Sequence, residues 1–211
     1  MTSIYFIFKR ELATYFLTPV AYIFLVIFLA ALGSFTFFLG SFFTRGQADL
    51  QVFFSFHPWV YLFLIPAIGM RLWSEERKTG TIELLMTLPV SAFKIVIAKF
   101  LAAWFFSFIA LFLTFPIWIS VNILGSPDNG VIAASYIGSF LMSGALISLV
   151  SCISASTKSQ VIAFILSVSI SFIFLMAGLD IILSVFKSWA PPLIINIISS
   201  LSILSNFQQI T

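Results

Sequence analysis

Residues 93–123 read FKIVIAKFLAAWFFSFIALFLTFPIWISVNI, and this stretch decides the fold class. Its only charges, Lys94 and Lys99, lie near its beginning, and nearly all the remaining residues are apolar or small. A helix crosses a bilayer with about 20 such residues. The whole chain has the same character, because 61% of its 211 residues are hydrophobic and 8% are charged, against about 25% charged in ordinary soluble domains. The sequence therefore predicts an all-α membrane protein.

Further apolar segments lie on both sides of this stretch, at residues 18–43, 51–70, 131–153 and 160–185. Together they predict a polytopic bundle of five spans in a single domain over residues 1–211. Pro191 and Pro192 end the last helix, and the tail at 191–211 is expected to be irregular or interfacial. A natural segment at the C-terminus is expected to be missing from the sequence.

Lysine and arginine are distributed unevenly over the loops. One set of loops holds Lys9, Arg10, Arg71, Arg77, Lys78, Lys94, Lys99 and Lys158, whereas the opposite loops hold Arg45 and Lys187. Cytoplasmic loops carry the excess of positive charge. The pattern therefore predicts a cytoplasmic N-terminus and places the polar loop at 71–91 in the cytoplasm.

An amphipathic helix is expected at residues 3–16, before the first span. Its apolar residues recur at helical spacing: Ile4, Ile7, Phe8, Leu12, Tyr15 and Phe16. Lys9, Arg10 and Glu11 interrupt them, which is typical of a helix lying in the membrane interface. The alternative is a basic flank that only sets orientation.

The loop at 71–91 is the largest polar insertion. Its charged part contains Glu75, Glu76 and Arg77 and leads into Gly80 and Thr81. A short helix is predicted over 82–88, because Pro89 stops it. Its apolar face would carry Ile82, Leu85 and Met86, and Glu83 would lie on another face. Such a helix can dock on a soluble partner, or it can be a solvated loop that rests on lipid.

Small residues recur four positions apart in the fourth and fifth spans. They are Ser139, Ser143, Gly144, Ser148, Ser167 and Ser171. Small residues at this spacing let membrane helices approach closely. Helix packing is the favoured interpretation, and the lining of a polar path is the alternative.

The sequence lacks the residues that several other functions require. The chain has no glycine-rich phosphate loop, no lysine- or arginine-rich patch for nucleic acid and no charge in the middle of a span. His57 is expected to be an interfacial polar group rather than a metal ligand, because metal sites need several ligands. Cys152 is expected to be packed between helices. No catalytic, cofactor or metal site is predicted.

The charged motifs resemble those of a known family. Lys9-Arg10-Glu11-Leu12, and above all residues 70–91, MRLWSEERKTGTIELLMTLPVS, are similar to ABC-2 type transporter permeases. Within that family they resemble the subgroup associated with gliding motility. The resemblance covers essentially the whole chain and is specific to the family, not to a substrate.

The resemblance implies a permease subunit in a bacterial cytoplasmic (inner) membrane, with residues 3–16 as its elbow helix. A separate, dimeric ABC ATPase would bind ATP and Mg²⁺ and dock on the loop at 71–91, and a second permease half would complete the path for export. The implied coupling residues are Glu75, Glu76, Arg77, Gly80, Thr81, Ile82, Glu83, Leu85 and Met86. The family normally has six spans, so a sixth is expected to be missing or disordered here.

Two other functions stay open at this point. The chain could be a membrane anchor or assembly component of an envelope or gliding-motility complex, bound to a further subunit and moving no substrate. It could also be an autonomous channel or secondary carrier, although the absence of mid-span charges argues against that.

Overall fold

A computed structural model describes residues 2–87, 89–179, 182–184, 191, 193, 195, 199–200 and 202–210. Regular structure in these residues is helical, which confirms the all-α class. The elements are α1 (Thr2–Leu17), α2 (Pro19–Ser34), the π-helix η1 (Phe35–Leu39), α3 (Gln51–Ser55), α4 (His57–Gly69), α5 (Arg71–Thr79), α6 (Thr81–Thr87), α7 (Ala92–Phe112), α8 (Phe115–Leu124), α9 (Asn129–Ser156), α10 (Gln160–Met176) and α13 (Ile203–Gln208).

Three helical stretches in the described residues are long and apolar enough to cross a membrane by themselves. They are Pro19–Leu39, Ala92–Leu124 and Asn129–Ser156, which correspond to the first, third and fourth predicted spans. The fifth predicted span appears as the apolar 17-residue helix α10. Its expected extension toward residue 185 runs into positions outside the described ranges. The chain is therefore built to cross the membrane several times.

The predicted second span differs from the others because it is interrupted. Its residues form α3 and the 13-residue α4, with breaks at Phe56 and Met70. Pro66 lies inside α4 and has no N–H to donate to the preceding turn. After Met70 the helical path continues as α5, which sequence reasoning had treated as part of a loop. The predicted span at 51–70 is therefore present as two helices, α3 and α4.

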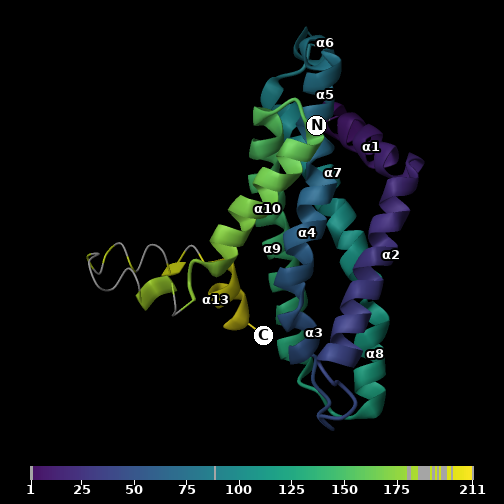
Figure 1. Ribbon diagram of the computed structural model, residues 1–211. Helices are drawn as coiled ribbons and strands as arrows, with labels where there is room; N and C mark the ends of the chain where they lie inside the picture. Colours follow the sequence, from purple (N-terminus) through teal and green to yellow (C-terminus); the bar gives the residue numbers. More distant parts are fainter. Residues whose placement is uncertain are drawn as a thin grey trace.

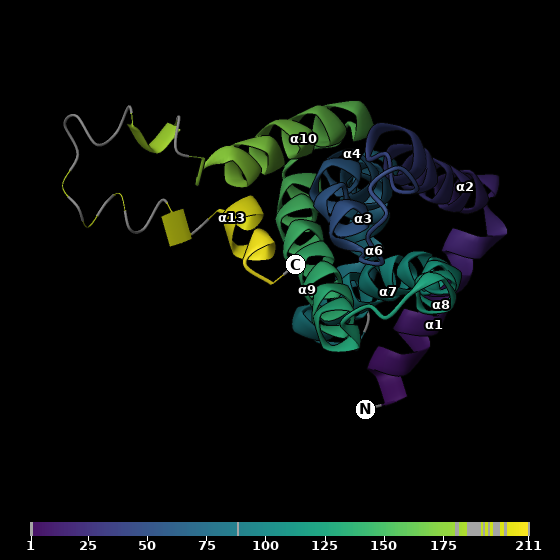
Figure 2. The same ribbon diagram turned by 90° about the horizontal axis from the view of Figure 1, so that it is seen from below.

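Helix α9 is the centre of the bundle. It contacts α4, α5, α7, α10 and α13, and Leu146, Ile147 and Val150 on it are completely buried. Figure 1 shows α2 along one side of the bundle and α10 along another, and Figure 2 shows the same arrangement from below. In the apolar stretch Pro19–Leu39, which includes α2, only 22% of the most apolar 18-residue segment is buried within the chain. Its remaining apolar surface, which includes Ile23 and Val26, suits lipid or another protein.

The elbow helix predicted at 3–16 is present as α1. The apolar residues that define its predicted inner face are partly covered, whereas Tyr5 and Phe6 are 60% and 66% exposed. Helix α1 packs mainly against α7, where the ring of Tyr15 stacks on Phe106 with centroids 5.4 Å apart. Figure 1 shows α1 turning sharply into α2. Thr18 lies at this turn, and Pro19 opens α2 because a helix tolerates proline in its first turn.

Part of the tail folds back on the bundle. Helix α13 contacts α9 and α10, and Leu204 and Phe207 on it are buried. Gly138 of α9 lies against Phe207 and Ile210, at a distance where an added Cβ would make ordinary van der Waals contact. The tail at 191–211 is therefore not wholly irregular, and several of its positions lie outside the described residues. No helix of the described residues corresponds to the expected sixth span.

Candidate functional site

The segment predicted to couple to a partner forms a helical hairpin, α5–Gly80–α6, at one end of the molecule (Figure 1). Gly80 ends α5 with φ +75°, a left-handed conformation that glycine adopts without a Cβ penalty. Arg77 and Lys78 lie in the last turn of α5, where positive charge complements the helix dipole. The hydroxyls of Thr79 and Thr81 lie 2.9 Å apart across the turn. The hairpin thus has a defined shape.

Helix α6 presents one face to its surroundings and buries the other. We call its exposed residues, Thr81, Glu83, Leu84 and Thr87, the α6 outer face. Leu84 is 68% exposed, whereas Leu85 is 8% exposed and belongs to the core, with Ile82 packed against it. The expectation that the face with Ile82 and Leu85 meets a partner is therefore wrong for Leu85, because its side chain is inside this chain. The side chain of Met86 lies outside the described positions.

Helix α5 is fixed to the end of α9 through one serine hydroxyl. Ser154 Oγ accepts hydrogen bonds from the backbone N–H groups of Trp73 and Ser74, both at 3.1 Å, and donates to the Met70 carbonyl at 2.8 Å. These backbone groups lie at the break between α4 and α5. A side chain inserted into the helix ladder commonly accompanies a bend. Ser154 thus satisfies the backbone where the two helices meet.

Two further side chains strengthen the contact between α5 and α9. The Trp73 indole N–H donates to Ser151 Oγ at 3.0 Å. The Arg77 guanidinium donates to the Ala155 carbonyl. Arg77 was predicted as a coupling residue, but its described partner belongs to its own chain. Its role visible here is to hold the hairpin on the bundle.

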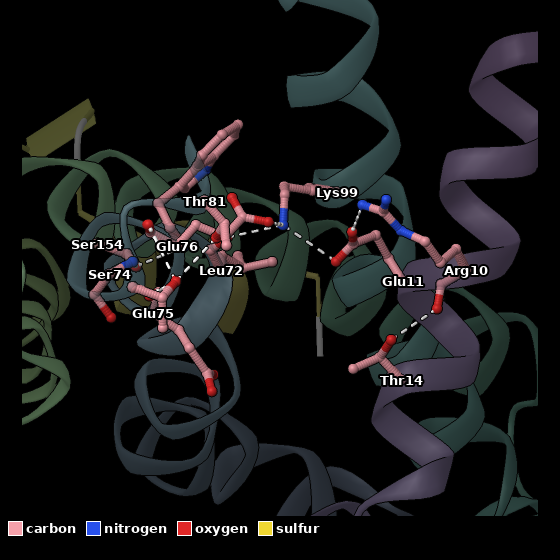
Figure 3. Close-up of polar contacts among 12 residues, drawn as sticks. Arg10, Glu11, Thr14, Leu72, Ser74, Glu75, Glu76, Thr81, Lys99 and Ser154 are labelled. Atoms are coloured by element: carbon pink, nitrogen blue, oxygen red, sulfur yellow. Dashed lines mark hydrogen bonds and ion pairs between the residues drawn. The ribbon is translucent and has the colours of Figure 1, made fainter. Parts of the chain in front are cut away.

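A buried lysine joins α1, α5 and α7. Lys99 Nζ is 3.1 Å from Glu11 Oε2 and 2.7 Å from Glu76 Oε1, and it donates to the Leu72 carbonyl at 3.1 Å. The Lys99 side chain is only 4% exposed. We call these groups the Lys99 cluster, and Figure 3 shows both carboxylates converging on the ammonium group. Burial of this charge is tolerable because two carboxylates and a carbonyl surround it.

The residues predicted for coupling fall into two groups, one that faces the Lys99 cluster and one that is exposed. Glu76 faces inward, with its side chain 17% exposed. Glu75, Gly80, Thr81 and Glu83 are exposed. The elbow residues divide in the same way, because Lys9 and Arg10 are exposed while Glu11 reaches Lys99 and also pairs with Arg10 at 2.6 Å.

The small-residue faces of α9 and α10 are mostly buried. Ser139, Ser143, Gly144, Ser167 and Ser171 lie inside the bundle. Ser143 Oγ lies 2.9 Å from Ser107 Oγ on α7, and the Trp104 indole covers Gly144. Ser148 was the wrong choice, because it is exposed and donates to its own helix at Ala145. These contacts agree with helix packing.

Two polar residues are placed differently from expectation. His57 is completely buried, not interfacial: its Nδ1 is 3.1 Å from Ser139 Oγ, and its ring stacks on Tyr61. Cys152 was expected to be packed but is exposed. No group of three or more histidine, cysteine or acidic residues that could hold a metal occurs in the described ranges.

Sequence reasoning missed the residues that hold the hairpin in place. Lys99 was counted only as a topological charge, and Ser154 was not singled out. One signal was available for Lys99, because a lysine followed by a long apolar run must find counter-charges if its helix packs inward. Nothing in the sequence marks Ser154 among its neighbouring serines, since its role depends on the bend at Met70.

The architecture and the apolar helices define a multi-pass, all-α membrane protein. A comparison with protein-family models matches residues 8–178 to the ABC-2 family transporter protein model. The chain therefore belongs to the ABC-2 family of transporter proteins, and the matched range includes most of α1, the hairpin and most of α10. No curated protein sequence matches the chain.

Proposed function

We propose that this chain is the permease subunit of an ABC exporter and that the α6 outer face docks on a separate, dimeric ABC ATPase that binds ATP and Mg²⁺. The observation that carries the proposal is the contrast between the two faces of α6. Leu84 is 68% exposed, although the rest of the hairpin is pinned to α9 and α7. An exposed leucine beside the acidic Glu83 on a firmly held projection suits a groove with a basic rim.

The anchoring of α5 gives such a docking site a mechanical use. Movement of a bound ATPase would reach α9 through Ser154 and would reach α1 and α7 through the Lys99 cluster. A loosely attached loop would flex locally and would not transmit this movement to the other helices. In the proposed complex a second permease half, a copy or a relative of this chain, pairs with it around the export path. The membrane chain supplies that path, and the ATPase supplies the energy.

Two substitutions on the α6 outer face test the docking site. Glu83→Arg reverses the exposed charge, and Leu84→Ala removes the exposed apolar side chain. Each is expected to weaken binding of the copurifying ATPase about tenfold, because a well-placed interface residue contributes more than about 1 kcal/mol. The measurements are ATPase retained by the tagged permease after washing and ATP turnover of the membranes.

Thr44→Arg is the matched control, because Thr44 is exposed on the loop between η1 and α3, at the opposite end of the bundle. It should leave both measurements unchanged. Wild-type ATPase retention and turnover in both hairpin variants would refute the docking assignment. Reconstituted complex then separates export from the anchor function: ATP-dependent movement of a lipid, polysaccharide or peptide into or out of liposomes supports export, and its absence supports an anchor.

We further propose that the hairpin end is cytoplasmic and that the membrane is a bacterial inner membrane. Cys152→Ser provides a background free of cysteine. In that background, a membrane-impermeant maleimide applied to intact spheroplasts should label Arg45→Cys and spare Lys78→Cys. The reverse pattern would invert the topology. The resemblance of residues 70–91 to gliding-motility-associated permeases supports membership of that subgroup, which the identities of copurifying chains would test.

A further inference from the structure

A cavity of about 340 Å³ lies beneath the elbow helix, between α1, α2, the α4–α5 junction and α7. A water molecule occupies about 30 Å³ in the liquid, so the cavity has room for roughly ten water-sized groups. This is enough for a polar headgroup and the beginning of an acyl chain. The cavity is separate from the α6 outer face, because no α6 residue lines it.

The walls of the cavity change from polar to apolar along its length. Arg10 of α1 and Arg71 at the start of α5 are lining residues on the elbow side, whereas Phe24, Ile68 and Phe106 come from within the spans α2, α4 and α7. Arg71 begins α5, and Ile68 lies near the end of α4, about one turn further into the bundle. The cavity lining therefore changes from polar to apolar in the direction from the elbow helix toward the spans. It follows the gradient from headgroups to hydrocarbon that a membrane imposes on a helix entering it.

Three basic and three acidic residues line the polar walls, and the ion pairs of the described residues leave one of each, Arg71 and Glu75, without a partner of opposite charge. Lys99 is taken up by Glu11, Glu76 and the Leu72 carbonyl, and Arg10 pairs with Glu11. Arg71 makes no ion pair in the described part of the chain, and its Nε is buried without a hydrogen-bond partner there. A buried guanidinium nitrogen without an acceptor is costly, and its planar donors match a phosphate or carboxylate.

A second donor lines the same space. Tyr15 on α1 faces the cavity wall beside Arg71, and burial raises the pKa of its hydroxyl. The hydroxyl therefore keeps its proton at neutral pH and can donate it. The hydroxyls of Thr14 and Thr18, which also line the cavity, already donate to backbone carbonyls of their own helical turns.

We propose that this cavity binds the phosphate headgroup of a membrane phospholipid, with Arg71 as its cation and the first part of an acyl chain on Phe24, Ile68 and Phe106. The bound lipid would connect the elbow helix to the beginning of α5, beside the Lys99 cluster. Figure 3 shows part of the polar rim, where Arg10 and Glu11 of α1 lie across from Glu75 and Glu76 of α5. The site requires neither an ATPase nor a transported substrate.

The test uses the purified chain in mild detergent with three probes. Dihexanoyl-phosphatidylglycerol carries phosphate and chains, dihexanoylglycerol carries only chains, and inorganic phosphate carries only the anion. Native mass spectrometry counts the bound molecules, and the rise in Tm with concentration gives their affinity. The phospholipid is expected to bind at least about tenfold more tightly than either fragment, because it satisfies both ends of the cavity.

Arg71→Gln should weaken phospholipid binding about tenfold or more, the loss typical of one charge-assisted hydrogen bond. Arg45→Gln removes an exposed arginine from the opposite loop and should leave binding unchanged. Ala67→Leu fills the apolar end while keeping Arg71, so it serves as a second variant if Arg71→Gln is unstable. It should also weaken binding about tenfold.

Three outcomes would overturn the proposal. Equal binding of dihexanoylglycerol would show that the headgroup contributes nothing. Equal binding of inorganic phosphate would identify a simple anion site. Wild-type affinity for the phospholipid in both Arg71→Gln and Ala67→Leu would place any bound lipid elsewhere on the protein. None of these outcomes bears on ATPase docking, which the α6 variants test separately.

Discussion

Replacing Lys99 with methionine removes the ammonium group and keeps a side chain of similar length. Glu76 would then have no cation and Glu11 would keep only the exposed Arg10, although the side chains of Glu11 and Glu76 are only 15% and 17% exposed. The Leu72 carbonyl would also lose its donor. Breaking a buried ion pair by removing one partner costs about 3–5 kcal/mol, and partial exposure of the acids places this case near 3 kcal/mol. That loss corresponds to a fall in Tm of roughly 6–12 °C for a chain of this size.

The assay is unfolding in mixed micelles by detergent titration, followed by tryptophan fluorescence, with Tm measured in parallel. Lys94→Met is the matched control, because Lys94 lies on the same helix but is exposed. It should change the free energy of unfolding by less than about 0.5 kcal/mol. Adding Glu76→Gln to Lys99→Met should restore part of the loss by removing one unpaired charge. Equal effects of Lys99→Met and Lys94→Met would refute the Lys99 cluster as a stabilising contact.

Two further predictions concern α9. Ser154→Ala removes the side-chain acceptor of two backbone N–H groups and leaves the Met70 carbonyl with the Ser74 hydroxyl as its remaining side-chain donor, so it should cost about 1–3 kcal/mol. The exposed Ser156→Ala should cost less than about 0.5 kcal/mol, and equal losses in the same titration would contradict the bridging role. Gly144→Ala places a Cβ 2.8 Å from the Trp104 indole nitrogen and should cost about 1–3 kcal/mol by overpacking. Its control, Gly33→Ala, has open space around it and should be neutral or slightly stabilising. A wild-type Tm in Gly144→Ala would show that the indole moves aside.

The parts of this fold that could be predicted are those governed by periodicity and charge. Long apolar runs gave the spans, and the spacing of Ile7 and Tyr15 gave the inner face of α1. The loop at 71–91 was identified as the main polar feature, with a short helix in its second half. Each of these depends on residues within one or two helical turns of each other, so the sequence carries the information directly.

The parts that could not be predicted depend on contacts between distant residues. Ser154 and Met70 are 84 positions apart, and Lys99 and Glu11 are 88 apart. The direction in which α6 turns its apolar side also depends on such contacts: Leu85 faces the core, while Leu84 is left outside. The two leucines are adjacent and chemically identical, so only tertiary packing distinguishes them. Burial of His57 was missed for the same reason, because its partner Ser139 comes from another helix.

The serine bridge at the α4–α5 break also joins the hairpin to two helices at once, to α4 through the chain and to α9 through Ser154. A continuous helix would carry a push on the hairpin straight down its own axis toward Pro66. Here the helix is interrupted after Met70, whose own N–H still donates to the Pro66 carbonyl, and Ser154 of α9 accepts from the N–H groups of Trp73 and Ser74. Movement of the hairpin would therefore reach α9 through the contacts of Ser154, Trp73 and Arg77, as well as α4 through the chain.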